Sequence, residues 1–414
     1  MSKIEKVKRL VLGIQHVIAM FGATVLVPIL TGLDPSIALI TAGIGTLIFH
    51  LCTKRKVPVF VGSSFAFITV IQVVASQFGD LRYAQGGIIV AGLLYILLSF
   101  IVMIFGVNRV KSFFPPVVTG PMIMVIGLSL SPVALSMASK NWLVSFVVIV
   151  TVAITSIFAR GFLKIIPILV GVIVGYGLSA ALNLIDYAPI VQAKMFSLAN
   201  FTLPIFDIGA IAIIAPVVLA TFMEHIGDIT TNGAVVGKNF YEDPGLHRTL
   251  MGDGLATTFA GLIGGPANTT YGENTSVLAV TKVYDPSILR LAAMIAVILG
   301  FLGKFGAILQ TIPEPVMGGV SVVLFSMITS VGMRTIASSD IDFTDNRNLL
   351  ISGLILIIGI GSEILKVDPN FQGVVGIQFG QNISITGVSL AALVGIIVNK
   401  LLPETKKIDV KNMD

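Results

Sequence analysis

The chain has 414 residues, of which 55% are hydrophobic and only 11% are charged. Soluble domains carry about 25% charged residues, so this composition leaves too few charges to cover a water-facing surface and excludes a soluble protein. The net charge of +5 is spread between apolar segments instead of forming one patch, so it does not indicate nucleic-acid binding. The single cysteine, Cys52, permits no intramolecular disulfide.

Long apolar runs follow one another along the chain, for example at 88–107, 143–159 and 349–360. A helix needs about 20 predominantly apolar residues to cross a bilayer. The runs therefore predict an all-α polytopic membrane protein with about 14 transmembrane segments. The predicted segments begin near residues 11, 36, 62, 86, 115, 142, 165, 208, 247, 273, 287, 314, 348 and 384.

The basic residues orient these segments. When the N-terminus is placed in the cytoplasm, alternation puts most of the 26 lysine and arginine residues on the cytoplasmic side, as the positive-inside rule requires. A wrong number of segments would reverse this bias partway along the chain, and the bias continues to the C-terminus. We therefore predict a multi-pass protein of the cytoplasmic (inner) cell membrane with both termini in the cytoplasm.

A short motif occurs twice. Residues 114–120 and 312–318 share the pattern apolar-Pro-x-x-Val-x-Gly, and each opens a long apolar segment. The two copies would lie on the fifth and twelfth segments, and an odd separation makes the two halves inverted in the membrane. Inverted repeats are typical of transporters. Coincidence is the alternative, because Pro and Gly are common at the ends of membrane helices.

Two segments are interrupted by extended, small and polar residues at 58–67 and 264–274. They are the third segment of each half, and both lead into a shortened helix. Irregular backbone survives at membrane depth only where protein or a water-filled cavity surrounds it. Paired broken segments of this kind predict a transporter's binding site, because their free N–H groups can hold an acceptor oxygen of a substrate.

Three carboxylates stand in otherwise apolar sequence. Glu224 and Asp228 are four residues apart, so they share one face of a helix. Glu273 begins the short helix of the tenth segment, where the helix dipole stabilises negative charge. An ionisable group at membrane depth costs free energy, so each is a candidate functional residue. The alternatives are that Asp228 already lies at the cytoplasmic interface and that Glu273 is an ordinary charge at a helix start.

Two carboxyl groups that face a small pocket suit a ligand with adjacent N–H and C=O groups. A carboxylate accepts from N–H, and a protonated carboxyl also donates to C=O. Burial disfavours the charged form of a carboxyl, so such groups can exchange protons and couple them to a substrate. Phe65 and Tyr271 are candidates for stacking on a planar ring, although packing alone would also explain them.

The other polar residues indicate neither an enzyme nor a metal site. His225 either relays protons or bonds to a neighbouring helix, and His16 is expected to make a packing hydrogen bond. Asp253 is expected to cap its helix or to pair with Arg248. Scattered histidines and one cysteine make no metal site, and the chain has neither a Walker loop nor a nucleophile elbow. We therefore expect no enzymatic activity, no metal and no cofactor.

Several motifs together resemble the nucleobase/ascorbate transporter family, also called nucleobase–cation symporter 2, and most of all its uracil permease branch. The resemblance covers nearly the whole chain, and the motifs that carry it lie at 21–28, 62–68, 224–227, 243–248 and 268–274. It implies a fold of two inverted repeats of seven spans. It also implies proton symport, with the proton as the coupling ion, and a homodimer in the lipid bilayer.

The same resemblance implies two domains and an elevator-like movement of one against the other. A core domain would comprise residues 1–110 (spans 1–4) and 207–311 (spans 8–11). A gate domain would comprise 111–206 (spans 5–7) and 312–403 (spans 12–14), followed by a cytoplasmic tail at 404–414.

The resemblance further implies a substrate site made of Glu224, Glu273, Phe65, Gly272, Tyr271 and Ala23. In similar proteins the two glutamates hydrogen-bond the pyrimidine, and the backbone at the positions of Phe65 and Gly272 reaches its carbonyl groups. The remaining two positions line the pocket. Glu224, Asp228 and Glu273 are the residues implied in proton coupling.

The chain departs from the uracil permease pattern at two places. Asp228 stands where these permeases often have a histidine, as in some purine-transporting relatives, and Thr275-Ser276 stands where a glycine is usual at the second position. Glu273 favours uracil, because the purine branch usually has glutamine there. The expected function is proton-coupled uracil import. The alternatives are a purine (xanthine or urate) symporter and, less favoured, an anion exchanger of related fold.

Overall fold

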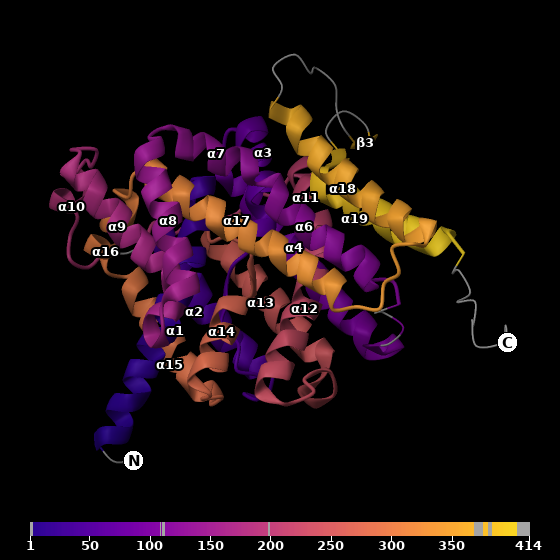
Figure 1. The fold of residues 1–414 in the computed structure, drawn as a ribbon, viewed down its shortest axis with the longest axis horizontal. Helices are drawn as coiled ribbons and strands as arrows, with labels where there is room; N and C mark the ends of the chain where they lie inside the picture. Colours follow the sequence, from indigo (N-terminus) through magenta and orange to yellow (C-terminus); the bar gives the residue numbers. More distant parts are fainter. Residues whose placement is uncertain are drawn as a thin grey trace.

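The computed structural model describes residues 3–107, 109, 112–197, 199–367, 376–379 and 383–403. Helices dominate the fold (Figure 1). The elements of the first half are α1 (Lys3–Thr31), α2 (Pro35–Cys52), β1 (Val61–Ser63), η1 (Phe65–Phe67), α3 (Ile68–Phe78), α4 (Leu81–Phe105), α6 (Pro116–Ser129), α7 (Ser131–Ser139), α8 (Trp142–Phe158), η2 (Gly161–Ile165), α9 (Pro167–Ala181) and α10 (Ala188–Gln192).

The second half repeats the early order of helix, helix, strand, short helix and helix. Its elements are α11 (Ile208–Ile214), η3 (Ala215–Val217), α12 (Val218–Val236), η4 (Tyr241–Gly245), α13 (Leu246–Ile263), β2 (Asn268–Thr270), α14 (Gly272–Thr281), α15 (Pro286–Gly300), α16 (Gly303–Gln310), α17 (Glu314–Ala337), α18 (Asn346–Val367), β3 (Gly376–Phe379), β4 (Ile383–Thr386) and α19 (Gly387–Leu401).

Aspartates set where several helices begin. Asp34, Asp80 and Asp285 precede α2, α4 and α15, and each carboxylate accepts a hydrogen bond from the backbone N–H two residues later, at 2.8, 2.8 and 2.9 Å. Pro35 and Pro286 follow two of these caps, and proline, which has no N–H, suits the first helical position because an N–H there would have no partner within the helix. Each connection therefore ends at a capping aspartate, and the apolar run that follows it forms the helix.

The two extended segments predicted to break the third and tenth apolar segments are confirmed, and they pair with each other. β1 and β2 form an antiparallel two-stranded sheet in the register Val61↔Thr270, Gly62↔Thr269 and Ser63↔Asn268. All six strand residues are buried. Antiparallel pairing is the arrangement expected for equivalent elements of two inverted halves.

Threonines on the neighbouring helices complete the hydrogen bonding of these short strands. On α2, the hydroxyl of Thr46 accepts from Val61 N at 2.9 Å and lies 3.1 Å from Val61 O. On α13, Thr257 does the same for Asn268, with 3.2 Å to its N and 2.9 Å to its O. Each threonine serves the first residue of one strand. Strand backbone at membrane depth is thereby satisfied from within the protein.

The most extensive helix pairs fall into two groups. In the first, α13 packs along α4 and α2, and α15 packs along α2 and α1. The first group also includes α12, which contacts α14 and α4, and α3, which follows η1 and contacts α4. In the second, α17 packs along α6, α7 and α8, while α18 packs along α6 and α19. Contacts between the groups are sparser and include those of α12 with α6 and α19.

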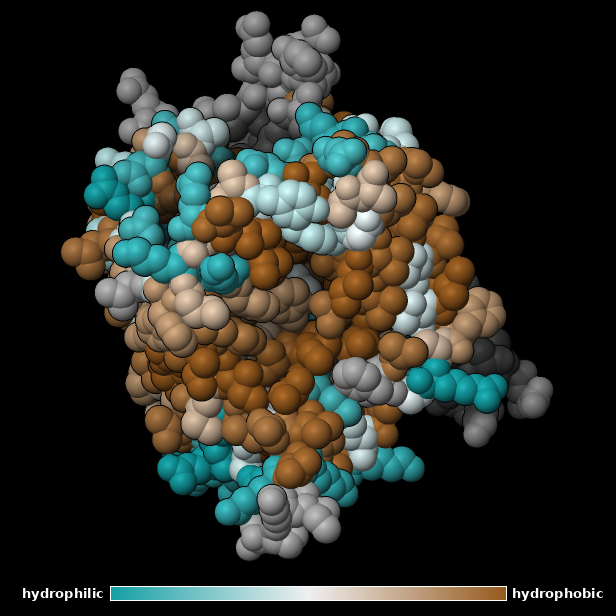
Figure 2. Space-filling model, turned by 90° about the vertical axis from the view of Figure 1, so that its left-hand side faces the viewer, coloured by the Kyte–Doolittle hydropathy of each residue, from teal (hydrophilic) through white to brown (hydrophobic). Residues whose placement is uncertain are grey.

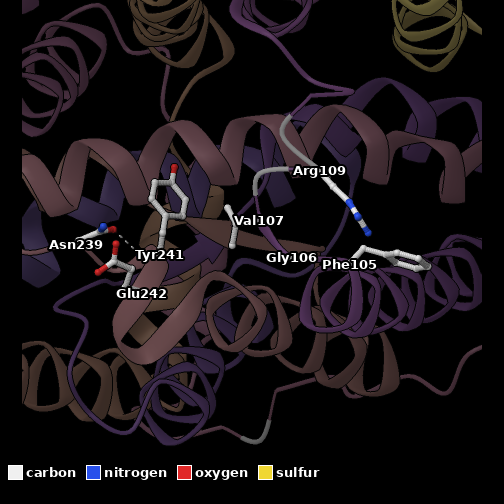
Figure 3. A pocket seen from close by; sticks show the side chains of 7 residues that line it. All are labelled: Phe105, Gly106, Val107, Arg109, Asn239, Tyr241 and Glu242. Carbon is white, nitrogen blue, oxygen red and sulfur yellow. Dashed lines mark hydrogen bonds between the residues drawn. The ribbon is translucent and has the colours of Figure 1, made fainter.

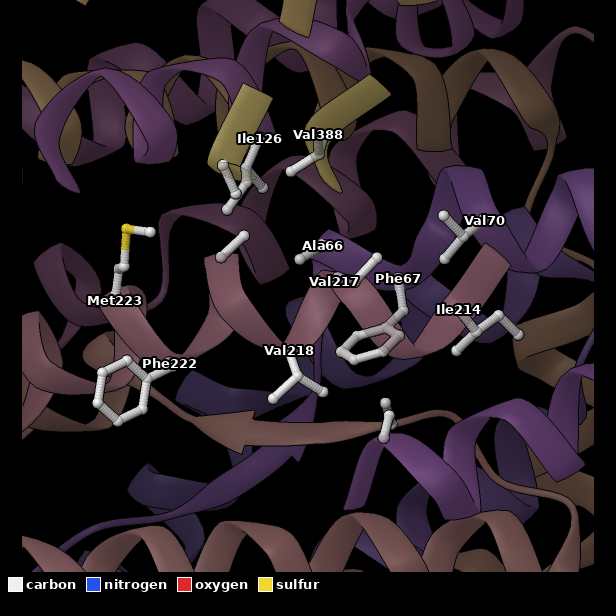
Figure 4. Close-up of a cluster of buried hydrophobic side chains, with 14 of the residues drawn as sticks. Ala66, Phe67, Val70, Ile126, Ile214, Val217, Val218, Phe222, Met223 and Val388 are labelled. Carbon is white, nitrogen blue, oxygen red and sulfur yellow. The ribbon is translucent and has the colours of Figure 1, made fainter. Parts of the chain in front are cut away.

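A buried apolar cluster lies where the two groups meet (Figure 4). Phe67 and Val70 from η1 and α3 and Val218 and Phe222 from α12 share this cluster with side chains of α6 and α19. Figure 4 shows Ile126 and Val388 above these residues. The side chains of this contact are apolar on both sides, so it is stabilised by the burial of apolar surface.

The outer surface is apolar over a broad area. Figure 2 shows hydrophobic side chains across the middle of the molecule and hydrophilic ones gathered above and below them. Six helical stretches of the described residues are long and apolar enough to cross a membrane, and α15 with α16, bent by 81°, would make a seventh. Other apolar helices are shorter, so the number of spans stays a prediction.

The predicted fold class is confirmed, and most predicted segments begin within a few residues of a helix or a strand–helix unit. The first and fourth helices begin earlier than predicted, at Lys3 and Leu81. The sequence did not predict α10, α16 or the hairpin of β3 and β4, which pairs Gly376 with Thr386. The tail predicted at 404–414 lies outside the described residues.

Candidate functional site

Helix α12 carries polar side chains along one stripe. Glu224, Asp228 and Asn232 follow one another at intervals of four residues, so they share one helix face. Glu224 is half-buried, and its Oε2 atom is buried without a hydrogen-bond partner among the described residues. A buried acceptor without a partner is costly, so this oxygen is available to a ligand that carries an N–H group.

The start of α14 lies opposite this stripe. A methyl group added to Gly272 would lie 3.5 Å from Asp228 Oδ1, which places the Asp228 carboxyl beside the first turn of α14. Glu273 is the next residue along that turn. Glu224, Asp228 and Glu273 lie within electrostatic range of one another. The structure therefore brings together all three carboxyls that the sequence singled out, and Asp228 faces the broken segment.

Tyr271 fixes the strand end that leads into α14. Its hydroxyl donates to the Ser63 carbonyl at 2.9 Å and accepts from Thr24 Oγ1 at 3.2 Å. Its ring covers Gly62, because a Cβ atom there would lie 2.5 Å from Tyr271 Cζ. Tyr271 thus connects β2 to β1 and to α1 by hydrogen bonds. Its role here is structural, in addition to any stacking on a ligand.

The other predicted lining residues belong to the same buried cluster as Tyr271. Ala23 on α1 is 1% exposed, and Phe65 at the start of η1 is 6% exposed. The Phe65 ring packs edge to face on Phe325 of α17, with ring centroids 5.8 Å apart. Phe65 therefore lies at the contact between the two helix groups.

A fully buried polar network stands behind Glu224. His225 Nδ1 lies 2.8 Å from Asp253 Oδ2, and His225 Nε2 lies 2.9 Å from Thr249 Oγ1. Thr270 Oγ1 of β2 donates to both Asp253 oxygens at 3.2 Å. The network joins α12, α13 and β2, so the hydrogen-bonding alternative for His225 fits the structure.

The expectation that Asp253 caps its helix or pairs with Arg248 is wrong. Asp253 is 0% exposed inside α13, and Arg248 donates instead to the Cys52 carbonyl at 3.2 Å. The neighbours Gly252 and Gly254 could have signalled this burial. A Cβ atom on the first would lie 2.6 Å from a Phe49 ring atom, and one on the second 2.9 Å from the Gly92 carbonyl oxygen, so both mark a close helix contact.

His16 makes the packing hydrogen bond expected of it. Asn274 Nδ2 on α14 lies 3.1 Å from His16 Nδ1 and donates to the His16 carbonyl at 3.0 Å. Among the described residues, no group of three or more His, Cys, Asp or Glu side chains is placed to hold a metal ion.

An exposed ion pair joins Lys56, in the connection from α2 to β1, to Asp243, in the connection from α12 to α13, with 2.6 Å between Lys56 Nζ and Asp243 Oδ2. The Lys56 ammonium holds the pKa of the Asp243 carboxyl below its usual value. A cavity of about 480 Å³ lies nearby, apart from the carboxyls, lined by Phe105, Gly106, Val107, Arg109, Asn239, Tyr241 and Glu242 (Figure 3). None of the predicted site residues lines it.

Solved structures share this fold. The structure of SLC26A9 matches with a TM-score of 0.68 and 10% sequence identity, covering 97% of this chain and 66% of that one. The transmembrane domain of the cyanobacterial bicarbonate transporter BicA matches with a TM-score of 0.59 and 16% identity, covering 88% of this chain and 98% of that one. At such identities the likeness concerns the fold alone.

Sequence relatives are far closer. The probable uracil permease of Haemophilus influenzae is 42% identical over 97% of this chain and 96% of its own length. The uracil permease of Bacillus caldolyticus is 45% identical over 95% and 91%, and that of Escherichia coli K12 is 38% identical over 97% and 95%. Residues 7–366 match the family described as "Permease family". The chain is therefore a multi-pass membrane protein of this permease family, the nucleobase/ascorbate transporter family that its motifs resemble.

Proposed function

We propose that the protein imports uracil by proton symport, with Glu224 and Glu273 as the residues that hold the base. The observation that carries this proposal is the meeting of Glu224, Asp228 and Glu273 at the start of α14. The names of relatives at 38–45% identity over nearly the whole chain support uracil as the substrate.

The chemistry of the site suits a pyrimidine ring. Uracil presents N–H donors beside C=O acceptors along its edge. A carboxylate accepts from N–H, and the partnerless Oε2 of Glu224 is available for this bond. The carbonyl groups of the base need donors, which the backbone N–H groups at Gly272 and at Phe65 can supply, since each begins a helical turn.

The same three carboxyls support proton coupling. Ionised carboxyls in an apolar interior repel one another, so the occupancy of the site by protons and by substrate is linked. Asp228, beside Gly272, takes the place of the histidine usual in similar permeases. We assign Glu224, Asp228 and Glu273 to the coupling step.

Movement is proposed to occur between a core domain (1–110 and 207–311) and a gate domain (111–206 and 312–403). The two groups of tightly packed helices support this division. The apolar contact in Figure 4 and the Phe65–Phe325 contact lie between them, and an apolar contact can slide without breaking hydrogen bonds. We further propose two inverted seven-span repeats, an inner-membrane location with both termini cytoplasmic, and a homodimer.

The proposal is tested with purified protein reconstituted into liposomes. Radiolabelled uracil added outside the liposomes should enter faster when the outside is more acidic than the inside. Glu224→Gln or Glu273→Gln should lower uptake at least about tenfold, because each loses a charge-assisted hydrogen bond. Uptake that ignores the proton gradient would remove the coupling, and full activity of either variant would remove the site.

Asp228 favours a second candidate, a purine symporter, because some purine-transporting relatives resemble the chain at this position. Competition decides between the two. Excess unlabelled uracil should suppress uptake of labelled uracil more strongly than xanthine does. Stronger competition by xanthine would move the substrate to the purines.

A further inference from the structure

One polar residue on the carboxyl-bearing face of α12 has no part in the proposed substrate contacts. Asn232 lies one turn beyond Asp228 and is 0% exposed. An amide at that depth needs partners for its two donors and its acceptor. Its partners connect the site to both broken segments.

The amide nitrogen of Asn232 makes two hydrogen bonds. It donates to the Pro58 carbonyl at 3.1 Å and to Thr275 Oγ1 at 3.0 Å. Pro58 lies just before β1, and Thr275 lies in α14 two residues after Glu273. One side chain therefore joins α12 to the approach of the first broken segment and to the helix that follows the second.

The bond between Asn232 and Thr275 is the only side-chain hydrogen bond between α12 and α14 in the part of the chain that the structure describes. The Pro58 carbonyl can only accept, so it sets the orientation of the amide with its nitrogen toward both partners. Asn232 Oδ1 is left buried without a partner among the described residues. The amide is thus held where it is by its two donor bonds and by nothing on its acceptor side.

The backbone gives Asn232 little freedom. The adjacent Gly233 lies so close to the returning chain that a Cβ atom there would be 2.6 Å from the Lys238 carbonyl oxygen. This end of α12 is therefore fixed by the loop behind it, and the amide transmits that fixed position to α14. Thr275, 3% exposed, has no room to turn toward solvent.

We infer that Asn232 and Thr275 form a positioning pair that holds the start of α14, and with it Glu273, at a set distance from Glu224. The inference rests on the proposed function for its substrate. The separation of the two glutamates decides whether both reach one small planar ring, so a shift of α14 weakens substrate binding before it changes the movement of the domains.

The hydroxyl of Thr275 is what the pair requires. Valine has the same shape without the acceptor, so it would leave an N–H of Asn232 buried and unpaired. Serine keeps the acceptor and loses only a methyl group. Thr275→Val and Thr275→Ser are therefore matched variants that separate the hydrogen bond from packing.

Initial rates of uracil uptake into liposomes should show this difference. Thr275→Val should raise the KM for uracil about fivefold or more, the loss expected of one hydrogen bond, with the maximal rate within about twofold of the unmodified protein. Thr275→Ser should keep both constants within about twofold. A normal KM for Thr275→Val, or an equal rise for both variants, would overturn the inference.

A thermal-stability cycle tests the pair without substrate. Asn232→Ala and Thr275→Val should each lower the melting temperature of the purified protein, and the double variant should be no less stable than Asn232→Ala alone, because both remove the same bond. Additive losses would refute the pair. Unmodified protein that takes up no uracil would refute the proposed function instead, and the stability cycle would still decide the pair.

Discussion

Gly62→Ala is the most direct test of how the broken segments hold the site. A methyl group at this position would lie 2.5 Å from Tyr271 Cζ, 2.6 Å from Cε2 and 2.8 Å from the hydroxyl oxygen. Carbon atoms in contact lie about 3.5–4.0 Å apart, so the ring would have to retreat by about 1 Å. Gly62 does not have a positive φ, so alanine adds a steric conflict and no backbone strain.

The retreat has a calculable cost. Tyr271 is held by bonds of 2.9 Å to the Ser63 carbonyl and 3.2 Å to Thr24, and a shift of this size takes its hydroxyl out of range. Overpacking costs about 1–3 kcal/mol. Each lost hydrogen bond adds about 0.5–1.5 kcal/mol. Because Gly272 and Glu273 follow Tyr271 directly, the carboxylate moves too, and misplacement of about 1 Å can lower a rate by about 100-fold.

Uptake of labelled uracil and the melting temperature of the purified protein measure both effects. Gly62→Ala should lower both, whereas Gly177→Ala on α9, where a new methyl group meets nothing within 4 Å, should lower neither. A smaller side chain at Tyr271 should relieve the conflict, so Gly62→Ala combined with Tyr271→Ala should be more stable than the sum of the single losses predicts. Unmodified uptake and stability in Gly62→Ala would refute the steric reasoning.

Three further variants test other parts of the molecule. Asp228→Asn should still bind uracil, but its uptake should lose most of its response to an imposed proton gradient; an unchanged response would remove Asp228 from the coupling step. Asp253→Asn should lower the melting temperature clearly, because an amide NH₂ replaces one of the two carboxyl oxygens to which His225 and Thr270 bond. An equally stable variant would show that this buried network contributes nothing to stability. Lys56→Met should leave melting temperature and uptake unchanged, since its partner Asp243 is exposed; a clear loss would show that this ion pair has more than a surface role.

The parts of the fold that depend on local composition could be predicted from the sequence. Apolar runs placed most helices because a bilayer requires runs of a certain length. The carboxyls of Glu224 and Glu273 stood out because charge is rare in such runs. The helices α10 and α16 could not be predicted in this way, because they are too short to produce an apolar run of bilayer length.

The pairing of β1 with β2 was beyond sequence reasoning. A strand of three residues has no periodicity to read, and its partner lies in the other half of the chain. The buried network of His225 and Asp253 was missed because its members are separated in sequence and join only when α12 and α13 pack. The only sequence signal for the burial of Asp253 is the pair of glycines on either side of it, and the sequence does not identify the helices that these glycines contact.

The two threonines beside the strands show why the sequence could not reveal the pairing. Thr46 and Thr257 look alike in the sequence: each is a lone hydroxyl in an apolar helix, and most such residues bond to their own helix. In the structure each closes the hydrogen bonding of one strand, from the second long helix of its half. A strand of three residues at membrane depth cannot satisfy its own backbone. The repeated helix–threonine–strand arrangement is therefore a physical requirement of the broken segments, and its recurrence in both halves supports the proposed inverted repeat independently of the motif at 114–120 and 312–318.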